Sequence, residues 1–337
     1  MQSPFVAFLS EHLSEIDDHL VSCFQNQTDS SDIETYLYAP LQRFTENGGK
    51  RHRPLICMLA AQAVGGDFRS ALSTASAIEH FQTAALIHDD IADNGQLRRG
   101  KPCMHLVEGV GLATNCGDLA LSMVTSSVLQ DPEFSDTTKV RLLHELTSMT
   151  ARTIEGQALD LGWVRDGRFD LSVDDYLTMA THKTAYYSGA TPLACGAIIG
   201  GGTQEQIEAL RSFGMDTGLA FQIQDDLLNL IGEKEARNKD FRSDITEGKR
   251  TLVAVKALED PVHRDELIRI LNAGATNPDT LAHAVELFQE TGAIDFARSY
   301  ALELTARAKV TLENVELETD AKKILMSMAD FFVERLN

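Results

Sequence analysis

The spacing of apolar residues limits this chain to helices almost throughout its length. Long stretches rich in Ala, Leu, Glu, Ile and Thr place apolar side chains three and four positions apart, which is the period of a helix with one buried face. Prolines number only eight in 337 residues, and alternating strand patterns are hard to find. Residues 71–93 leave few positions for solvent, so we expect a buried helix there. The sequence therefore predicts an all-α fold.

Turn-forming residues punctuate the chain, but no run of them is long enough to be a linker between domains. We therefore expect a single all-helical domain over residues 1–337. The segment 232–248 mixes charged residues with glycine, a composition typical of mobile loops over active sites. This segment is a candidate lid.

The charge balance narrows the choice of partners. Acidic residues outnumber basic ones by 50 to 30, which gives a formal net charge of -20. Such a surface repels nucleic acid and anionic membranes, so neither is an expected partner. The same charge repels phosphorylated substrates. Any phosphate site in this chain must therefore carry local cations or metal ions.

Targeting and cysteine patterns predict a cytoplasmic protein. The first twenty residues mix four acidic side chains with apolar ones and lack a basic start, so we expect no signal peptide. We also expect no transmembrane segment, because no apolar stretch is long enough to cross a bilayer. The five cysteines are scattered and form no Cys-x-x-Cys pair, which favours reduced thiols over disulfides or zinc ligands.

Two acidic motifs, far apart in the chain, each follow an apolar helical segment. On a helix, positions i, i+1 and i+4 project to one side, where their oxygens can share a hard cation such as Mg²⁺. A single triplet in so acidic a chain is more often solvated surface. The second copy, after another apolar helix, favours a metal site. The candidate metal ligands are Asp89, Asp90 and Asp93 in the first motif and Asp225, Asp226 and Asn229 in the second.

Basic residues gather at two turns. Residues 48–54 read Gly-Gly-Lys-Arg-His-Arg-Pro at a predicted loop-to-helix junction, where free backbone N–H groups and glycine help to receive an anion. Residues 97–101 read Leu-Arg-Arg-Gly-Lys, shortly after the first acidic motif. The second cluster alone could be a solvated turn. Lys183, Lys239 and Lys249 would be ordinary surface lysines without further context.

Taken in order, these motifs resemble the trans-isoprenyl diphosphate synthases, the polyprenyl synthetase family. The resemblance implies an isoprenoid-synthase helical bundle around a central active-site cavity, and a homodimer packed through helices that include residues 115–129. The matching segments lie between residues 47 and 251: Gly-Gly-Lys-Arg-x-Arg-Pro, Asp-Asp-x-x-Asp with Arg-Arg-Gly, Gly117-Asp118, Lys183-Thr184-Ala185, Phe-Gln-x-x-Asp-Asp and Glu247-Gly248-Lys249.

The resemblance also implies a role for each matching residue. Three Mg²⁺ ions would bind the diphosphate of an allylic substrate (dimethylallyl, geranyl or farnesyl diphosphate), held by Asp89, Asp90, Asp93, Asp225 and Asp226. Its outer oxygens would lie on Arg98, Lys183 and Lys239, with Lys249 as a further substrate-binding lysine. Isopentenyl diphosphate would lie on Lys50, Arg53, Arg99 and Gln82. Oxygen dipoles of Thr184 and Gln222 would face the allylic carbocation.

Two residues depart from the common family pattern. Asn229 replaces the usual third aspartate of the second motif, so its amide oxygen can coordinate a ligand but brings no charge. Gln82 stands where many members have histidine, which keeps a hydrogen-bond donor but loses a titratable group. The loop pattern between Lys239 and Lys249 is kept only in part.

Product length in this family depends on the residues just before the first acidic motif. Bulky residues four and five positions before it block chain growth early, but here those positions hold Ala85 and Ala84. Phe81 lies one helical turn further and could form the floor of a deeper pocket, or could be ordinary core. We therefore predict geranylgeranyl diphosphate as the main product.

Three other functions stay open. A terpene cyclase or an irregular prenyl-coupling enzyme would share the chemistry, but would not need the basic residues implied for isopentenyl diphosphate. A non-catalytic subunit that regulates a related synthase would tend to lose the acidic motifs, and both motifs are present. A passive cation-binding helical protein leaves the basic motifs unexplained.

Overall fold

The computed structural model describes residues 3–232 and 242–333. Helices make up nearly all of their regular structure, and the strands among these residues form one short hairpin. The predicted all-α class is confirmed. The described residues divide into two compact units. Those within Met1–Ser148, Thr191–Arg211 and Val315–Ser327 form unit 1, and those within Met149–Ala190, Ser212–Asn314 and Met328–Asn337 form unit 2.

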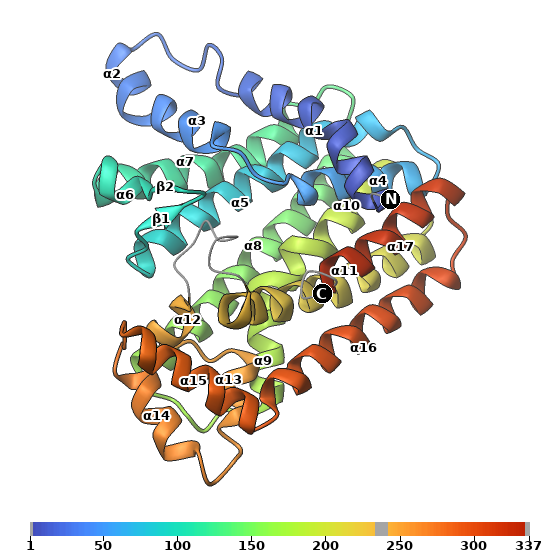
Figure 1. Cartoon of the computed structure of the whole chain (residues 1–337). Helices are drawn as coiled ribbons and strands as arrows, with labels where there is room; N and C mark the ends of the chain where they lie inside the picture. Colours follow the sequence, from blue (N-terminus) through green and yellow to red (C-terminus); the bar gives the residue numbers. More distant parts are fainter. Residues whose placement is uncertain (1–2, 233–241, 334–337) are drawn as a thin grey trace. The chain divides into compact units, whose positions relative to one another are not determined.

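Unit 1 holds the N-terminal helices and the hairpin (Figure 1). Its elements are α1 (Pro4–Ser22), α2 (Ser31–Ile33), the π-helical η1 (Glu34–Tyr38), α3 (Ala39–Glu46), α4 (His52–Ala63), the 3₁₀ turn η2 (Phe68–Ala71), α5 (Leu72–Ala92), β1 (Leu97–Arg98), β2 (Lys101–Pro102), α6 (Met104–Val107), α7 (Val110–Leu129) and α10 (Thr191–Ile199).

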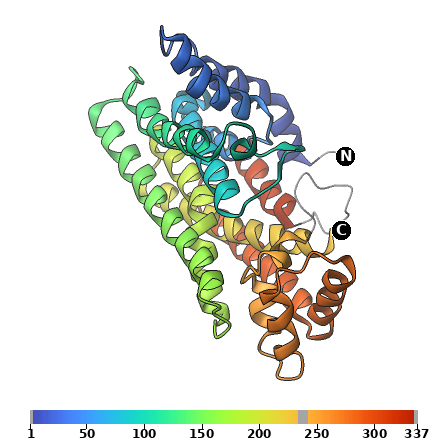
Figure 2. The same ribbon diagram turned by 90° about the vertical axis from the view of Figure 1, so that its left-hand side faces the viewer.

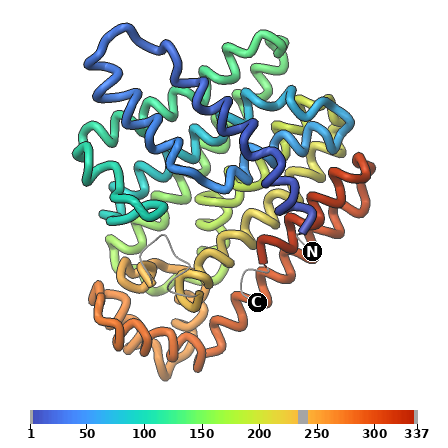
Figure 3. The backbone as a smooth tube through the Cα atoms, turned by 45° about the horizontal axis from the view of Figure 1, so that its top comes forward, coloured from blue at the N-terminus to red at the C-terminus, as the bar shows by residue number. Residues whose placement is uncertain are grey.

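Helix α5 is the centre of unit 1. It packs along α7 and against α4, while α1 lies on both α4 and α5 (Figure 3). As the sequence predicts, most of its residues from Thr74 to Ala84 are buried. Helix α4 approaches α10 closely because Gly196 has no side chain: a Cβ there would lie 1.9 Å from the carbonyl oxygen of Cys57. This packing fixes the helix that ends in the first acidic motif.

Unit 2 holds most of the C-terminal helices. Those wholly within it are α9 (Val173–Ala180), the π-helical η3 (Thr181–Ala190), α12 (Ser243–Thr246), α13 (Leu252–Ala257), α14 (Arg264–Asn272), α15 (Pro278–Glu290) and α16 (Ala293–Glu313). Three further helices contribute residues to both units: α8 (Asp136–Arg165), α11 (Gln204–Ile231) and α17 (Thr319–Val333).

One apolar core holds unit 2 together. Helix α13 packs against α9, α15 and α16, and α15 also packs on α14 and α16, which are orange to red in Figure 2. Tyr176, Ile223 and Leu227 belong to this core, so α9 and α11 are held on the same cluster. Helix α9 begins at a capping box, in which Ser172 and Asp175 exchange hydrogen bonds. The core thus brings the second acidic motif, on α11, close to α9.

The remaining expectations concern the cysteines, membrane spans, the candidate lid and the number of domains. All five cysteines are free thiols. Among the described residues, no helix is both long enough and apolar enough to span a membrane. Most of the candidate lid, residues 232–248, lies outside the described residues. A single domain over the whole chain stays a prediction.

Candidate active site

The first acidic motif lies at the C-terminal end of α5. Asp89 and Asp90 belong to its last turn, and Asp93 is the residue at which the helix ends. The main chain then turns back, because the N–H of Gly95 donates to the carbonyl oxygen of Asp90 at 2.9 Å. Asp90 is buried, whereas Asp89 is about one-fifth exposed. The three candidate ligands therefore share one end of one helix, as the spacing predicts.

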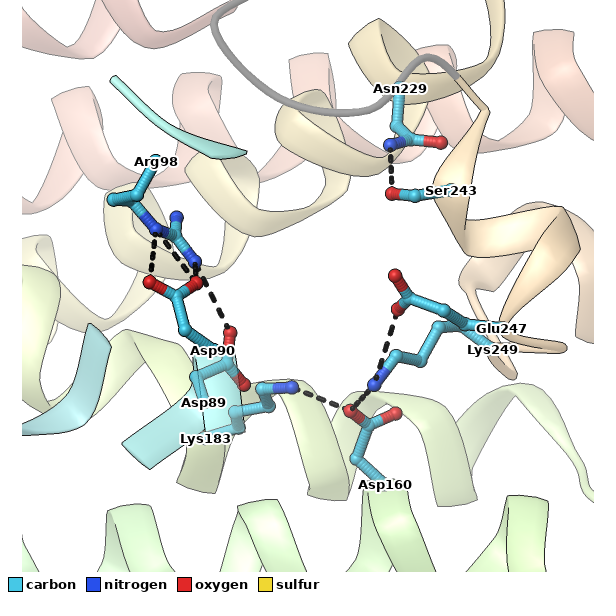
Figure 4. Close-up of polar contacts among 9 residues, drawn as sticks. All are labelled: Asp89, Asp90, Arg98, Asp160, Lys183, Asn229, Ser243, Glu247 and Lys249. Carbon is cyan, nitrogen blue, oxygen red and sulfur yellow. Dashed lines mark hydrogen bonds and ion pairs between the residues drawn. The ribbon is translucent and has the colours of Figure 1, made fainter. Parts of the chain in front are cut away.

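A hairpin after α5 brings a cation onto this motif. Strands β1 and β2 pair Arg98 with Lys101, and the two turn residues Arg99 and Gly100 both have positive φ, at 53° and 76°. This is the geometry of a tight two-residue hairpin turn. Arg98 points back to α5: its Nε donates to the two carboxylate oxygens of Asp90 at 3.0 and 3.2 Å, and its Nη2 also contacts Asp90 (Figure 4).

Arg98 also lies near Asp89, with 3.9 Å between Nη2 and Oδ2 (Figure 4). Burial acts to lower the pKa of Arg98, but the hydrogen bond and charge of Asp90, followed by the charge of Asp89, raise that pKa overall. The two carboxylates carry one more charge than the single guanidinium neutralises, so this helix end stays negative. A residual negative charge is what the predicted cation site requires.

Arginines of the two basic motifs lie close together. Burial lowers the pKa of Arg99, Glu79 opposes this, and the positive charges of Arg51, Arg98 and Arg53 lower it further. Gly49 lies between two of these groups: a Cβ on it would be 3.1 Å from Nη2 of Arg99 and 3.3 Å from Nη1 of Arg51. Burial and neighbouring positive charges that lower the pKa of Arg99 in this way favour a bound anion. The structure thus brings the two predicted basic motifs together.

Arg51 anchors this cluster; it belongs to the predicted basic motif, but the sequence assigned it no role of its own. Its Nε donates to Asp17 at 2.8 Å, its Nη1 to Glu79 at 2.5 Å and its Nη2 to the carbonyl oxygen of Thr45 at 2.5 Å. The residue has a left-handed backbone, with φ at 45°, immediately before α4. Arg51 therefore ties α1, α3 and α5 to the loop that carries Lys50. The motif letters alone gave no sign of this role.

Gln82 is a buried polar group with spare hydrogen-bonding capacity. It lies on α5, 7% exposed, and its Oε1 has no hydrogen-bond partner in the described part of the chain. An orphaned buried polar atom is costly unless a ligand or water satisfies it. Gln82 thus fits the substrate-binding role implied for it. Arg53 is also buried, in the first turn of α4.

In unit 2, the second acidic motif is part of a hydrogen-bonded chain of side chains. The hydroxyl of Tyr176 donates to Oδ2 of Asp226 at 2.8 Å, and Nε2 of Gln222 donates to its Oδ1 at 2.6 Å. Thr184 in turn donates to Oε1 of Gln222 at 2.5 Å. The predicted residues Thr184, Gln222 and Asp226 therefore lie together. Tyr176 is a member that the sequence reasoning missed.

Asn229 contacts two residues at the start of α12. Its Nδ2 donates to the hydroxyl of Ser243 at 3.1 Å, and its Oδ1 accepts from the backbone N–H of Asp244 at 3.3 Å (Figure 4). The amide thereby holds the start of α12. Its role as a metal ligand stays a prediction.

Lys183 and Lys249 meet at a residue that was not predicted. Asp160, near the end of α8, accepts from Nζ of Lys183 at 2.5 Å and from Nζ of Lys249 at 3.3 Å, while Lys249 also lies 3.7 Å from Glu247 (Figure 4). Lys239 lies outside the described residues.

The residues predicted to set chain length lie on α5. Phe81 and Ala84 are buried and Ala85 is half-buried. Ala84 belongs to an apolar cluster with Phe24 and with Ala113, Cys116 and Ala120 of α7. The role of Phe81, Ala84 and Ala85 in product length stays a prediction.

The chemistry of these donors suits magnesium. Burial raises the pKa of Asp226 well above its usual value, the charge of Asp244 adds to this, and Asp225 contributes further, while the hydrogen bonds from Tyr176 and Gln222 oppose it. Both of those donors are neutral. A buried carboxylate among like charges, with hard oxygens around it, fits a divalent cation.

Protein side chains alone would not complete a coordination shell. Among residues 3–232 and 242–333, no three His, Cys, Asp or Glu side chains are grouped closely enough to hold an ion by themselves. Mg²⁺ commonly keeps waters and binds through one or two carboxylates together with substrate phosphates. The donor set fits ions of that kind.

Known proteins resemble the chain over nearly its full length. The polyprenyl synthetase family model matches residues 34–288. A short chain isoprenyl diphosphate synthase of Methanothermobacter thermautotrophicus is 41% identical over 309 residues, which cover 90% of this chain and 92% of that protein. The chain belongs to the polyprenyl synthetase family. The predicted membership is confirmed, and as a polyprenyl synthetase the protein is a prenyltransferase.

Solved structures of polyprenyl synthetases have the same fold as this chain. The geranylgeranyl pyrophosphate synthetase of Pyrococcus horikoshii has a TM-score of 0.89 and 31% identity, with 98% of both chains covered. A geranylgeranyl pyrophosphate synthase of Corynebacterium glutamicum, solved with isoprenyl diphosphate and magnesium, has a TM-score of 0.86 and 29% identity, with 99% of both chains covered.

Proposed function

We propose that this chain is a Mg²⁺-dependent trans-prenyltransferase that condenses isopentenyl diphosphate with an allylic diphosphate. The observation that carries the proposal is the arrangement in unit 1. There Arg98 contacts the acidic end of α5, and the next residue, Arg99, lies near the positive charges of Arg51 and Arg53. Unit 1 thus offers carboxylates for metal ions as well as cations for a diphosphate. A passive acidic surface requires neither feature.

The charges explain the need for metal. Asp89, Asp90, Asp93, Asp225 and Asp226 with a trianionic diphosphate, set against Arg98, Lys183 and Lys239, leave about -5, and three Mg²⁺ ions bring the sum to about +1. Bound there, the ions supply Lewis-acid stabilisation of the departing diphosphate. The number of ions and the ligand set, including Asn229, are part of the proposal.

The chain's own residues perform the remaining tasks. Arg98, Lys183 and Lys239 hold the allylic diphosphate as its carbon–oxygen bond breaks, and Lys249 is a further substrate-binding lysine. The hydroxyl of Thr184 donates a hydrogen bond to the amide oxygen of Gln222 at 2.5 Å. These two groups direct oxygen dipoles at the allylic carbocation. Lys50, Arg53, Arg99 and Gln82 hold isopentenyl diphosphate, whose double bond attacks the cation. The released diphosphate takes the proton, so the reaction needs no histidine or glutamate base.

The proposed product is geranylgeranyl diphosphate. Small residues at Ala84 and Ala85 permit growth past farnesyl diphosphate, and Phe81, one turn earlier on α5, ends the pocket. Phe81→Ala is expected to lengthen the product, and Ala84→Phe to shorten it. Product analysis by mass spectrometry checks both, and an unchanged length for Phe81→Ala removes Phe81 from this role.

A homodimer packed through α7 belongs to the same proposal. Val110 and Leu129, at the two ends of this helix, are exposed apolar side chains in the single chain. Light scattering of the purified protein tests the dimer.

The test of function is turnover by the purified chain with Mg²⁺, labelled isopentenyl diphosphate and allylic diphosphates of increasing length. The proposal predicts incorporation of label into a prenyl diphosphate, lost on chelation of the metal. Conversion of an allylic diphosphate without isopentenyl diphosphate would indicate a cyclase or a coupling enzyme instead. A lack of turnover by the chain alone would indicate a regulatory subunit.

A further inference from the structure

Asp160 is a buried carboxylate that contacts two lysines. It lies on α8, 3% exposed, and its Oδ2 accepts from both ammonium groups (Figure 4). Burial acts to raise the pKa of Asp160, but the charges and hydrogen bonds of Lys183 and Lys249 lower it overall. The carboxyl is therefore ionised. One negative charge is shared by two positive ones, so the three side chains together carry +1, and Glu247, 3.7 Å from Lys249, offsets this charge from the other side.

Backbone packing holds Lys183 beside α8. Gly156 lies one turn before Asp160, and a Cβ on it would be 2.1 Å from the backbone nitrogen of Lys183. Only glycine allows η3 to approach α8 so closely. The side chain of Lys183 consequently reaches Asp160 from the adjacent element.

A second anchor holds Lys249. The next residue, Arg250, is 1% exposed; its Nε donates to the carbonyl oxygen of Arg168 at 2.6 Å, its Nη1 donates to that of Gly248, and its guanidinium lies 3.8 Å from the ring centre of Phe169. Gly248 has φ at 64°, which favours glycine. The loop is thus fixed on both sides of Lys249. The ammonium groups of Lys249 and Lys183 both contact Oδ2 of Asp160.

We propose that Asp160 is a positioning residue that gathers Lys183 and Lys249 into one diphosphate-binding pair. Two ammonium groups that approach the same oxygen repel each other, and without a shared counter-ion they would separate or lose a proton. Asp160 offsets that repulsion and keeps the two ammonium groups side by side, where an anion can contact both. The inference rests on the proposed function, because it takes the anion to be a diphosphate.

The experiment measures binding of inorganic pyrophosphate with Mg²⁺ by calorimetry, so that no turnover is required. Asp160→Asn keeps the shape of the side chain and removes its charge, and we expect at least tenfold weaker binding. Asp166→Asn is the matched control, since it removes the same charge from an exposed carboxylate just past α8. The control should bind within twofold of the wild type. A folded Asp160→Asn protein that also binds within twofold overturns the proposal.

Steady-state kinetics separate positioning from general damage to the fold. Asp160→Asn should raise KM for the allylic diphosphate at least tenfold and leave KM for isopentenyl diphosphate within twofold. An equal rise in both overturns the proposal. Should the Asn variant fail to fold by circular dichroism, Asp160→Glu decides, because it keeps the charge but displaces it by one methylene. We expect it to weaken pyrophosphate binding at least threefold, and unchanged binding would contradict us.

A double-mutant cycle tests whether Asp160 acts through Lys183. In a Lys183→Met background, Asp160→Asn should change pyrophosphate affinity by less than twofold. Effects that multiply would show that Asp160 acts by another route. Failure of the proposed function differs from failure of the proposal for Asp160. In that case the wild-type protein would bind pyrophosphate but elongate no allylic substrate.

Discussion

The hydroxyl of Tyr176 donates a hydrogen bond to Oδ2 of Asp226 at 2.8 Å, with both side chains buried in unit 2. Tyr176 lies on α9 and Asp226 on α11, so this bond joins the helix of the second acidic motif to its neighbour. It fixes the direction of a carboxylate proposed to bind metal, and groups behind the ligands commonly tune metal affinity in this way.

Tyr176→Phe should therefore raise the Mg²⁺ concentration needed for half-maximal activity, roughly tenfold by the usual effect of removing such a partner. Titration of activity with Mg²⁺ measures it. Tyr300→Phe, in the same unit but packed on Phe296 of α16, is the matched control and should leave the requirement unchanged. An unchanged Mg²⁺ requirement in Tyr176→Phe would remove Tyr176 from this role.

Arg51 should matter for stability as well as for binding. Arg51→Met leaves the buried carboxylate of Glu79 without its cation, a loss worth about 3 kcal/mol in the free energy of unfolding. Arg69→Met breaks an exposed pair with Glu15, a loss worth less than about 1 kcal/mol. Urea denaturation compares the two variants. Equal losses would show that burial does not strengthen the Arg51 contacts.

Stability should fall in mild acid because of His80. Burial lowers the pKa of this side chain to about 4, and the charges of His19 and Arg51 add to the effect. The unfolded chain binds a proton near pH 6.5, but the folded chain resists it, so the folded state loses stability as pH falls from about 6.5 to 4. Full titration through this window costs about 3 kcal/mol.

His80→Gln should flatten this part of the profile, measured as the melting temperature between pH 7 and pH 4. His52 is also buried with a lowered pKa, so part of the slope should remain. A slope identical to that of the wild type would show that His80 is protonated in the folded protein.

Two glycines of α8 should respond oppositely to alanine. Gly156→Ala places a methyl group against the backbone of Lys183, so we expect a loss of about 2 kcal/mol in stability and reduced activity. Gly162→Ala has nothing within 4 Å of the new Cβ and should stabilise the helix by up to about 1 kcal/mol. Thermal melts and activity assays test both. A harmless Gly156→Ala would mean that η3 can move away from α8.

Sequence reasoning predicted features that depend on local periodicity. The buried helix before Asp89 and the all-α class follow from the spacing of apolar residues, and motif order sufficed for the family. It missed Asp160, Tyr176 and Arg51, because each acts through residues far away in the chain. Arg51, for example, contacts Asp17 and Glu79, which lie 34 and 28 positions away. Such pairs are set by tertiary packing, which no local pattern records.

Asn229 illustrates a different limit. Its position in the motif suggested a weakened metal ligand, whereas the structure gives its amide two partners at the start of α12. The amide NH₂ donates to the Ser243 hydroxyl and the amide oxygen accepts from the backbone N–H of Asp244, and neither contact adds a charge. The sequence showed which residue was substituted, but not what the substitute contacts.

We propose that the two acidic motifs bind the same diphosphate through shared divalent ions. A crystal structure with Mn²⁺ and a non-reactive allylic diphosphate analogue would show this, since anomalous scattering locates each ion. We predict ions bound to Asp89 and to Asp225 that contact the oxygens of one diphosphate. Ions at only one motif, or a diphosphate bound away from both, would show that the two motifs do not share a substrate.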